Sequence, residues 1–306
     1  MAERNKLPYQ ETIPSHTMSA NYAYVTIATS KNYLPGLMAM YLSLKQTGTH
    51  IPLYAMLPHN LVVAEPKAID SLQKSGVNIL KYSHSVDIPQ QLIDNNATQG
   101  DHRFSHTFDK LLIFGLTQFD KIVFLDADIQ ILHSLDHLFN MPHMSAMIAG
   151  RSYPGNEDWI DLTSGIMTII PQNGLVEKIA TKIPDVIEQK GACGDQDILQ
   201  AYYSDWPQHP ELDMGEKYGI IAYYADYYEK HLGYHYTNDI EDTKSVAIIH
   251  YAGEKKPWMQ HWSHLSVLKQ ELQLAALRLL HIRNTAAVLL EYKHLVRKAR
   301  KMLYAK

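Results

Sequence analysis

The stretch KIVFLDADIQIL, residues 121–132, joins an apolar run to a pair of carboxylates. Its apolar run, Ile122 to Leu125, has the length of a buried strand, and two carboxylates one residue apart, Asp126 and Asp128, follow it. In open α/β sheets, ligands bind beyond the carboxyl ends of the strands. Because Ala127 is small, both carboxylates can turn toward one divalent cation, and hard oxygen ligands favour Mg²⁺ or Mn²⁺. The alternative is a turn cap, since aspartate favours turns and helix starts.

Strand and helix patterns alternate around this stretch, which predicts an α/β fold with a mainly parallel sheet. The expected strands are 22–29, 51–58, 77–83, 121–125, 145–149, 162–170 and 245–251. The expected helices are 33–46, 64–75 with Gly76 as its C-cap, 106–119, 195–203, and one long helix or two in tandem from 263 to the end. Residues 84–103 are polar and are expected to form a loop.

Composition narrows the class of protein. The 306 residues suffice for a large domain with a buried core, and 46% hydrophobic with 20% charged residues is typical of a globular protein. A single cysteine, Cys193, is typical of a reducing compartment. Because we find neither a signal peptide nor a run of ~20 apolar residues, we expect a cytoplasmic protein. The net charge of −4 disfavours nucleic acid as a partner.

The end of the chain is basic although the whole chain is acidic. From His281 onward Glu291 is the single acid, against Arg283, Lys293, Arg297, Lys298, Arg300, Lys301 and Lys306. The same helix carries the apolar residues Leu289, Leu290, Tyr292, Leu295, Val296, Leu303 and Tyr304. Such a basic amphipathic helix can lie as a peripheral element on the inner face of an anionic membrane. It can equally pack on the acidic body or on another subunit of a homo-oligomer.

Two further segments place polar side chains where they could serve the same site. In IIHYAGEKKPW (248–258), His250 ends an expected strand, Gly253 permits a tight turn, and Lys256 follows. The histidine can ligate a metal and the lysine can face a phosphate, although most of the 17 histidines must have ordinary roles. In CGDQDILQAYY (193–203), Asp195 and Gln196 begin a helix, where Asp195 can also be a simple N-terminal cap.

In this order the segments resemble glycosyltransferase family 8 over residues 22–258. These are retaining sugar transferases that include glycogenin and the bacterial lipooligosaccharide galactosyltransferases. The resemblance is carried by VTIATSKNYL (25–34), TFDKLLIF (107–114), FLDADIQIL (124–132), DLTSGIMTI (161–169), GDQDIL (194–199) and HYAGEKKPW (250–258). It implies a GT-A fold, in which helices flank a Rossmann-like nucleotide-binding mixed sheet. It also implies a UDP-sugar donor and Mn²⁺ or Mg²⁺ as the cofactor. We expect a polar extension at 1–21, the GT-A catalytic domain at 22–262, and a basic amphipathic helical tail at 263–306.

The resemblance implies a role for each matching residue. The implied metal ligands are Asp126, Asp128 and His250. The implied UDP-sugar contacts are Ile27, Thr29, Ser30, Tyr33, Lys110, Asp126, Ala127, Asp128, Thr163, Ser164, Gly165, Gly253 and Lys256. The implied catalytic residues are Gln196, Asp195 and Lys110. Because a glutamine is a poor nucleophile, we expect the acceptor to attack from the face that UDP leaves, with Gln196 and Asp195 positioning the sugar.

Departures from the family leave the substrates open. Thr163 stands where the family usually has asparagine, and Ala192 replaces an aspartate of glycogenin. The self-glucosylated tyrosine of glycogenin has no clean counterpart among the four tyrosines between residues 223 and 228. We therefore expect transfer of a hexose to a saccharide or glycolipid acceptor. A glycogenin-like self-glycosylating protein, a non-catalytic UDP-sugar binding relative and a nucleotide-sugar hydrolase are the alternatives.

Overall fold

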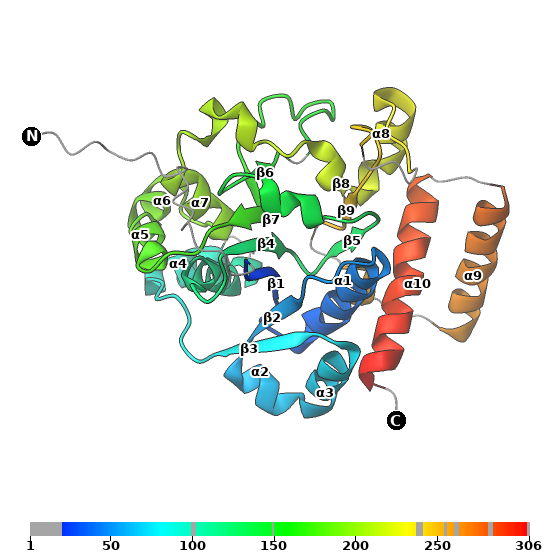
Figure 1. Cartoon of the computed structure of the whole chain (residues 1–306), viewed down its shortest axis with the longest axis horizontal. Helices are drawn as coiled ribbons and strands as arrows, with labels where there is room; N and C mark the ends of the chain where they lie inside the picture. Colours follow the sequence, from blue (N-terminus) through cyan, green and yellow to red (C-terminus); the bar gives the residue numbers. More distant parts are fainter. Residues whose placement is uncertain are drawn as a thin grey trace, which may run out of the picture.

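The computed structural model describes residues 20–98, 102–148, 150–236, 241–253, 256–259, 263–280 and 284–304. Its centre is a six-stranded sheet in the order β3-β2-β1-β4-β7-β6, with helices on both faces (Figure 1). Its strands are β1 (Tyr22–Ile27), β2 (Leu53–Pro58), β3 (Asn78–Tyr82), β4 (Lys121–Leu125), β6 (Ala146–Met147) and β7 (Thr163–Ile169). Strands β1 to β4 pair in parallel, whereas β7 pairs antiparallel with both β4 and β6. The expected α/β class with a mixed sheet is confirmed.

A smaller sheet and the helices complete the chain. The second sheet has the order β5-β9-β8, with β5 (Ile129–Ile131), β8 (Ile220–Ile221) and β9 (Ile248–His250). The α-helices are α1 (Leu34–Gln46), α2 (His59–Ala64), α3 (Pro66–Ser75), α4 (Gln90–Thr98), α5 (Leu175–Ala180), α6 (Ile183–Lys190), α7 (Asp195–Tyr202), α8 (Ala225–Leu232), α9 (His264–Leu279) and α10 (Thr285–Tyr304). The 3-10 helices are η1 (Lys31–Tyr33), η2 (His102–Gly115), η3 (Asp136–Asn140), η4 (Trp206–Gln208), η5 (Pro210–Leu212), η6 (Glu216–Tyr218), η7 (Ala222–Tyr224) and η8 (Pro257–Met259).

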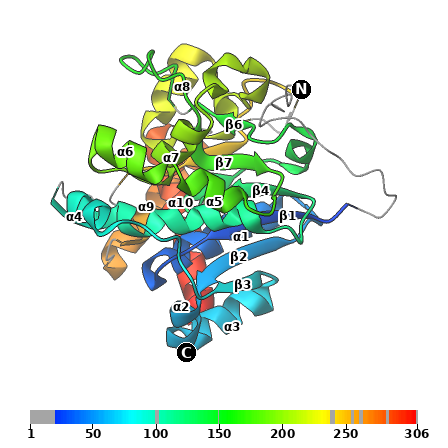
Figure 2. The same ribbon diagram turned by 90° about the vertical axis from the view of Figure 1, so that its left-hand side faces the viewer.

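The central sheet is buried on both faces, which explains why its strands are continuous apolar runs rather than alternating ones. In β4, Val123 and Leu125 belong to the core that includes α1 and α10, while Ile122 and Phe124 belong to the core that includes η2 and α7. This division follows from the opposite directions of successive side chains in a strand. In Figure 2 the helices α4 to α7 lie on the near side of the molecule, and α9 and α10 lie behind.

Two segments differ from the expectation. Residues 84–103 were expected to be a loop, but Gln90–Thr98 form α4. This short helix is polar in composition, yet it buries Leu92 and Asn96, and the Asn96 side chain both donates to and accepts from the backbone of Cys193. The expected helix at 106–119 is instead the 3-10 helix η2, which ends at Gly115.

The C-terminal segment forms two helices in tandem, and α10 lies between α1 and α9 (Figure 1). Most of the apolar residues that the sequence placed on a membrane-facing helix are buried in the core, namely Leu290, Tyr292, Leu295, Val296 and Leu303. The arrangement favours packing on the body for α10, because burying this apolar stripe against α1 leaves little of it to contact lipid. Within the described residues, every helix is too short or too polar to cross a bilayer.

Sheet topology determines where polar side chains meet. Because β1 and β4 are parallel neighbours, they end at the same edge of the sheet. Strand β7 runs the other way, so its first residues lie beside the last residues of β4, and the Asp126 amide donates to the Gly165 carbonyl at 2.9 Å. The edge beyond Leu125 therefore collects the loop after β1, the acidic loop after β4 and the start of β7.

Candidate active site

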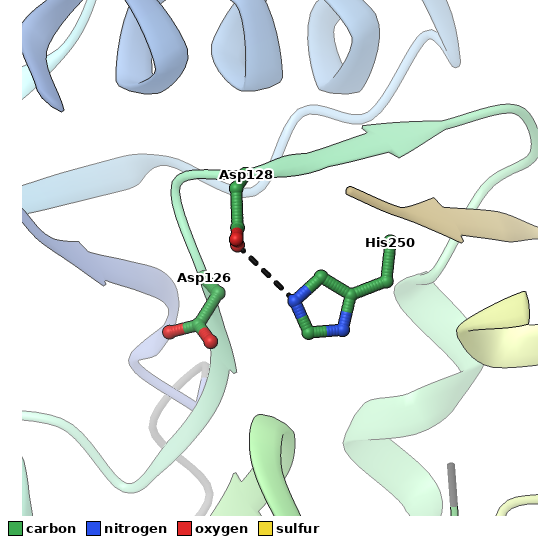
Figure 3. Close-up of side chains that lie close together, drawn as sticks. All are labelled: Asp126, Asp128 and His250. Atoms are coloured by element: carbon green, nitrogen blue, oxygen red, sulfur yellow. Dashed lines mark ion pairs between the residues drawn. The ribbon is translucent and has the colours of Figure 1, made fainter. Parts of the chain in front are cut away.

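A cluster of two carboxylates and an imidazole lies at this edge. Strand β5 follows the acidic loop and pairs with β9, which places Ile129 opposite His250. One donor atom from each of Asp126, Asp128 and His250 lies within 4.8 Å of the others. Figure 3 shows the two carboxylates and the imidazole facing a common space, with the ion pair of Asp128 and His250 dashed. This one strand pairing thus brings His250 next to Asp126 and Asp128, which lie 122 or more positions earlier in the sequence.

The donor set fits a hard divalent cation. Carboxylate oxygens and one imidazole nitrogen suit Mn²⁺ or Mg²⁺. The Asp128 Oδ1 to His250 Nε2 distance is 3.2 Å, close to the separation of about 3.0 Å between neighbouring ligands of an octahedral ion with ~2.1 Å bonds. Gly165 lies against two of the ligands, because an added Cβ would lie 3.1 Å from His250 Cε1 and 3.4 Å from Asp126 Oδ2. The absence of a side chain at this position leaves room for both ligands.

Two neighbouring cations hold the Asp128 carboxylate ionised despite its burial, whereas burial raises the pKa of Asp126. Burial alone would raise the pKa of Asp128, but His250 and Lys256 hold it below its usual range. The Lys256 Nζ lies 2.5 Å from Asp128 Oδ2. For His250, burial would lower the pKa, and the neighbouring Asp128 raises it above its ordinary value. Asp128 therefore has two ion-pair partners in the structure, the imidazole of His250 and the ammonium of Lys256.

A second cation lies deeper, between the metal cluster and α7. The Lys110 Nζ from η2 is 3.1 Å from Asp126 Oδ1 and 2.9 Å from Asp195 Oδ2. It also donates to the backbone and hydroxyl oxygens of Ser164, each at 3.2 Å. Burial disfavours the charged ammonium, but the two carboxylates more than compensate and raise the pKa of Lys110. This buried lysine links the strand end, the start of β7 and the start of α7.

The start of α7 presents Asp195 and Gln196 to the same space. Asp195 accepts from the Ser164 hydroxyl at 2.7 Å, and Gln196 Oε1 accepts from the Ser164 amide at 3.2 Å. The N-terminus of the helix is capped instead by Asp197, whose Oδ2 accepts from the Gly194 amide at 2.8 Å. The alternative that Asp195 is a simple cap is therefore not what the structure shows, since its carboxylate contacts Lys110 and Ser164.

One cavity of about 520 Å³ contains most of the residues that sequence reasoning selected. The selected residues that line it are Ile27, Thr29, Tyr33, Lys110, Asp126, Ala127, Asp128, Ser164, Asp195, Gln196, His250, Gly253 and Lys256. Three selected residues are not among those lining the cavity, namely Ser30, Thr163 and Gly165. The Thr163 hydroxyl donates to the Met147 carbonyl of β6 at 2.9 Å, which turns it toward a neighbouring strand.

Sequence reasoning missed several residues that line or support the cavity. Thr107 lines it and accepts from the Asp195 amide at 3.3 Å, and Asp197 and Ala252 line it as well. Trp258 supports it from behind, since an added Cβ on Gly36 would lie 2.5 Å from the indole and 2.8 Å from the Ala127 carbonyl. Thr107 could have been selected from the sequence, because it is the first residue of the TFDKLLIF motif. No sequence pattern indicates the contact between α1 and the indole of Trp258.

Known proteins share this chain's sequence and fold. Over 189 residues the chain is 30% identical to UDP-glucuronate:xylan alpha-glucuronosyltransferase 2 of Arabidopsis thaliana, covering 61% of this chain and 28% of that protein. Over 248 residues it is 27% identical to Glycogenin-1 of Caenorhabditis elegans, covering 77% of this chain and 50% of that protein. The matches thus span half or less of the length of these two relatives.

Solved structures support the same fold. The galactosyltransferase LgtC, crystallised with donor and acceptor sugar analogs, superposes with a TM-score of 0.52 at 14% identity, covering 90% of this chain and 95% of that one. The fold of this chain is therefore that of the GT-A glycosyltransferases, as expected. Residues 24–261 match the family described as Glycosyl transferase family 8, which is most of the chain. This chain belongs to glycosyl transferase family 8.

Proposed function

We propose that this protein is a retaining, metal-dependent hexosyltransferase that uses a UDP-sugar and acts on a saccharide or lipid-linked glycan. The observation that carries the proposal is the convergence of Asp126, Asp128 and His250 with two buried lysines around one cavity. The cavity volume of about 520 Å³ lies within the ~300–1,000 Å³ range of small-molecule sites. Membership of the family supports glycosyl transfer as the reaction.

In this proposal the three ligands hold Mn²⁺ or Mg²⁺, which supplies Lewis-acid neutralisation of the donor diphosphate when bound. Lys256 contacts Asp128 in the structure and is placed to exchange this partner for a phosphate oxygen of the donor. Ile27, Thr29 and Tyr33 line the cavity next to the end of β1 and form the proposed base and ribose contacts. These residues bind and orient the nucleotide as UDP departs.

The sugar would lie against the start of α7. Asp195 Oδ2 is engaged by both Lys110 and Ser164, which fixes the carboxylate in one orientation. A carboxylate held in this way is suited to positioning the sugar and to stabilising positive charge at its anomeric carbon. Gln196 lines the cavity beside it and is a poor nucleophile. This chemistry supports attack by the acceptor on the face that UDP leaves, with retention of configuration.

The contacts of three of the four tyrosines favour a packing role over self-glycosylation, whereas Tyr223 is exposed. Tyr224 stacks on Tyr153 with ring centroids 3.8 Å apart, and Tyr227 contacts the edge of the same ring at 5.0 Å. Tyr228 is buried and donates to Glu216 at 3.1 Å. Transfer to a separate acceptor is the better supported alternative.

The buried thiol of Cys193 is consistent with the cytoplasmic location that we propose.

The proposal is tested by Asp128→Asn, with Asp70→Asn on the exposed surface of α3 as the matched control. We expect Asp128→Asn to abolish Mn²⁺-dependent turnover of a panel of UDP-sugars, because an amide cannot replace the anionic ligand. Circular dichroism should show an intact fold in both variants. NMR of the product should show the donor's anomeric configuration. Full activity of Asp128→Asn after removal of metal by a chelator would refute the mechanism, and an inverted product would refute retention.

A further inference from the structure

The outer side of α9 exposes a row of leucines. Their exposed fractions range from 56% to 80%, for Leu265, Leu268, Leu272, Leu279 and Leu280, which we call the leucine face. The first four fall within an arc of about 60° around the helix axis. The opposite side of α9 packs on α10 and buries Leu274. Single exposed leucines are ordinary, but a contiguous apolar row marks an interaction surface.

The two C-terminal helices carry an excess of positive charge. The single acidic residue of α9, Glu271, turns toward α10, where it pairs with His294 at 2.9 Å and with Arg297. The acid of α10, Glu291, pairs with Arg278. The described parts of α9 and α10 carry two acids against seven basic residues, which are Lys269, Arg278, Lys293, Arg297, Lys298, Arg300 and Lys301. The whole chain is acidic, with a net charge of −4, so the two helices form a basic region on an acidic protein.

The position of α9 and the charge of the two helices indicate which kind of partner binds the leucine face. In Figure 1, α9 is the outermost helix beyond α10, so no other helix covers the side of α9 that faces away from α10 among the described residues. A two-fold contact between copies of this chain would bring two basic helix pairs together, which their like charges disfavour. An anionic bilayer accepts an exposed apolar row and attracts the excess positive charge of the two helices.

We propose that α9 docks the protein peripherally on an anionic lipid surface, with the leucine face in the interfacial layer. Lys269 follows Leu268 on α9, and the excess positive charge of α9 and α10 attracts the anionic surface across the short distance of the helix pair. The sequence pointed to the last helix for such a contact, but the structure buries the apolar stripe of α10 and exposes that of α9. This proposal does not depend on the proposed reaction, because it rests on a surface formed by the C-terminal helices.

The test is co-sedimentation of the full chain with vesicles of phosphatidylcholine alone or mixed with phosphatidylserine. The triple variant Leu268→Gln, Leu272→Gln and Leu279→Gln should reduce binding to the anionic vesicles by roughly tenfold or more. The control is Val63→Gln, which changes a residue of α2 with 65% exposure and should bind as the wild type does. The wild type should bind the neutral vesicles weakly, and its binding to anionic vesicles should fall as salt is added.

A second variant separates charge from burial. Lys298→Gln with Lys301→Gln should weaken binding to anionic vesicles and flatten its salt dependence, while leaving the leucines in place. Analytical ultracentrifugation without lipid should show the same oligomeric state for the wild type and the triple variant. Unchanged vesicle binding by the triple variant would overturn the proposal. So would a wild-type oligomer that the triple variant loses, since a second copy would then be the occupant of the leucine face.

Discussion

Substitutions of Tyr292 to phenylalanine and to alanine should change stability in opposite directions. The side chain of Tyr292 extends from α10 into the core, and its ring stacks on Tyr251 with centroids 3.6 Å apart at 7°. Trp258 contacts it edge-on at 6.2 Å. Its buried hydroxyl has no hydrogen-bond partner among the described residues. Because Tyr251 directly follows His250, the same ring also supports the metal cluster from behind.

The magnitudes follow from these contacts. Tyr292→Phe keeps the stacked rings and removes a buried hydroxyl that has no hydrogen-bond partner among the described residues. Burying such a group typically costs about 1–3 kcal/mol of stability. We therefore expect the free energy of unfolding to rise by about 1 kcal/mol. Tyr292→Ala removes the whole ring from a fully buried site, which typically costs about 3–5 kcal/mol. It should also weaken Mn²⁺ binding, since His250 loses the packing of its neighbour.

Urea unfolding with and without Mn²⁺, together with calorimetric titration of Mn²⁺, would measure both effects. The phenylalanine variant serves as the control for the alanine variant, because it should keep the Mn²⁺ affinity of the wild type. If Tyr292→Phe lowered the free energy of unfolding by more than about 1 kcal/mol, the Tyr292 hydroxyl would have to make a hydrogen bond in the folded protein. If Tyr292→Ala left Mn²⁺ affinity unchanged, the support of the metal cluster by α10 would be wrong.

Two further predictions concern the charges of the site. Lys110→Met should lower the free energy of unfolding by about 3–5 kcal/mol, because it leaves two buried carboxylates without their cation. Urea unfolding should show a smaller loss of stability for Lys110→Arg. Equal stability of the wild type and Lys110→Met would contradict the ion-pair account. Mn²⁺ affinity should fall as pH decreases through the pKa of His250, which Asp128 raises against the effect of burial, because a protonated imidazole cannot bind metal. Without metal the sign reverses, since the raised pKa gives a stabilising contribution that is present at low pH and lost as pH rises through it. Titrations of Mn²⁺ and of urea across this pH range check both signs, and a pH-independent Mn²⁺ affinity would contradict the first.

Local patterns predicted the elements that depend on neighbouring residues. The strand expected at 121–125 has the same bounds in the structure, because a strand buried on both faces of the sheet is a continuous apolar run in the sequence. Gly76 ends α3 with φ of +108°, as expected for a left-handed C-cap. The helix α4 was missed because its two buried residues, Leu92 and Asn96, are too few to give a periodic pattern.

Residue types and their spacing by themselves determined the α/β class, the acidic pair after β4 and the candidate ligands, because these depend on short-range periodicity and on the chemistry of side chains. The tertiary structure alone decided that β5 pairs with β9, which joins His250 to Asp128, and that Lys110 lies between two carboxylates. It also decided which C-terminal helix keeps an exposed apolar face. Both helices carry leucines at helical spacing, and only packing against α1 shows that the face of α10 is covered while that of α9 is not.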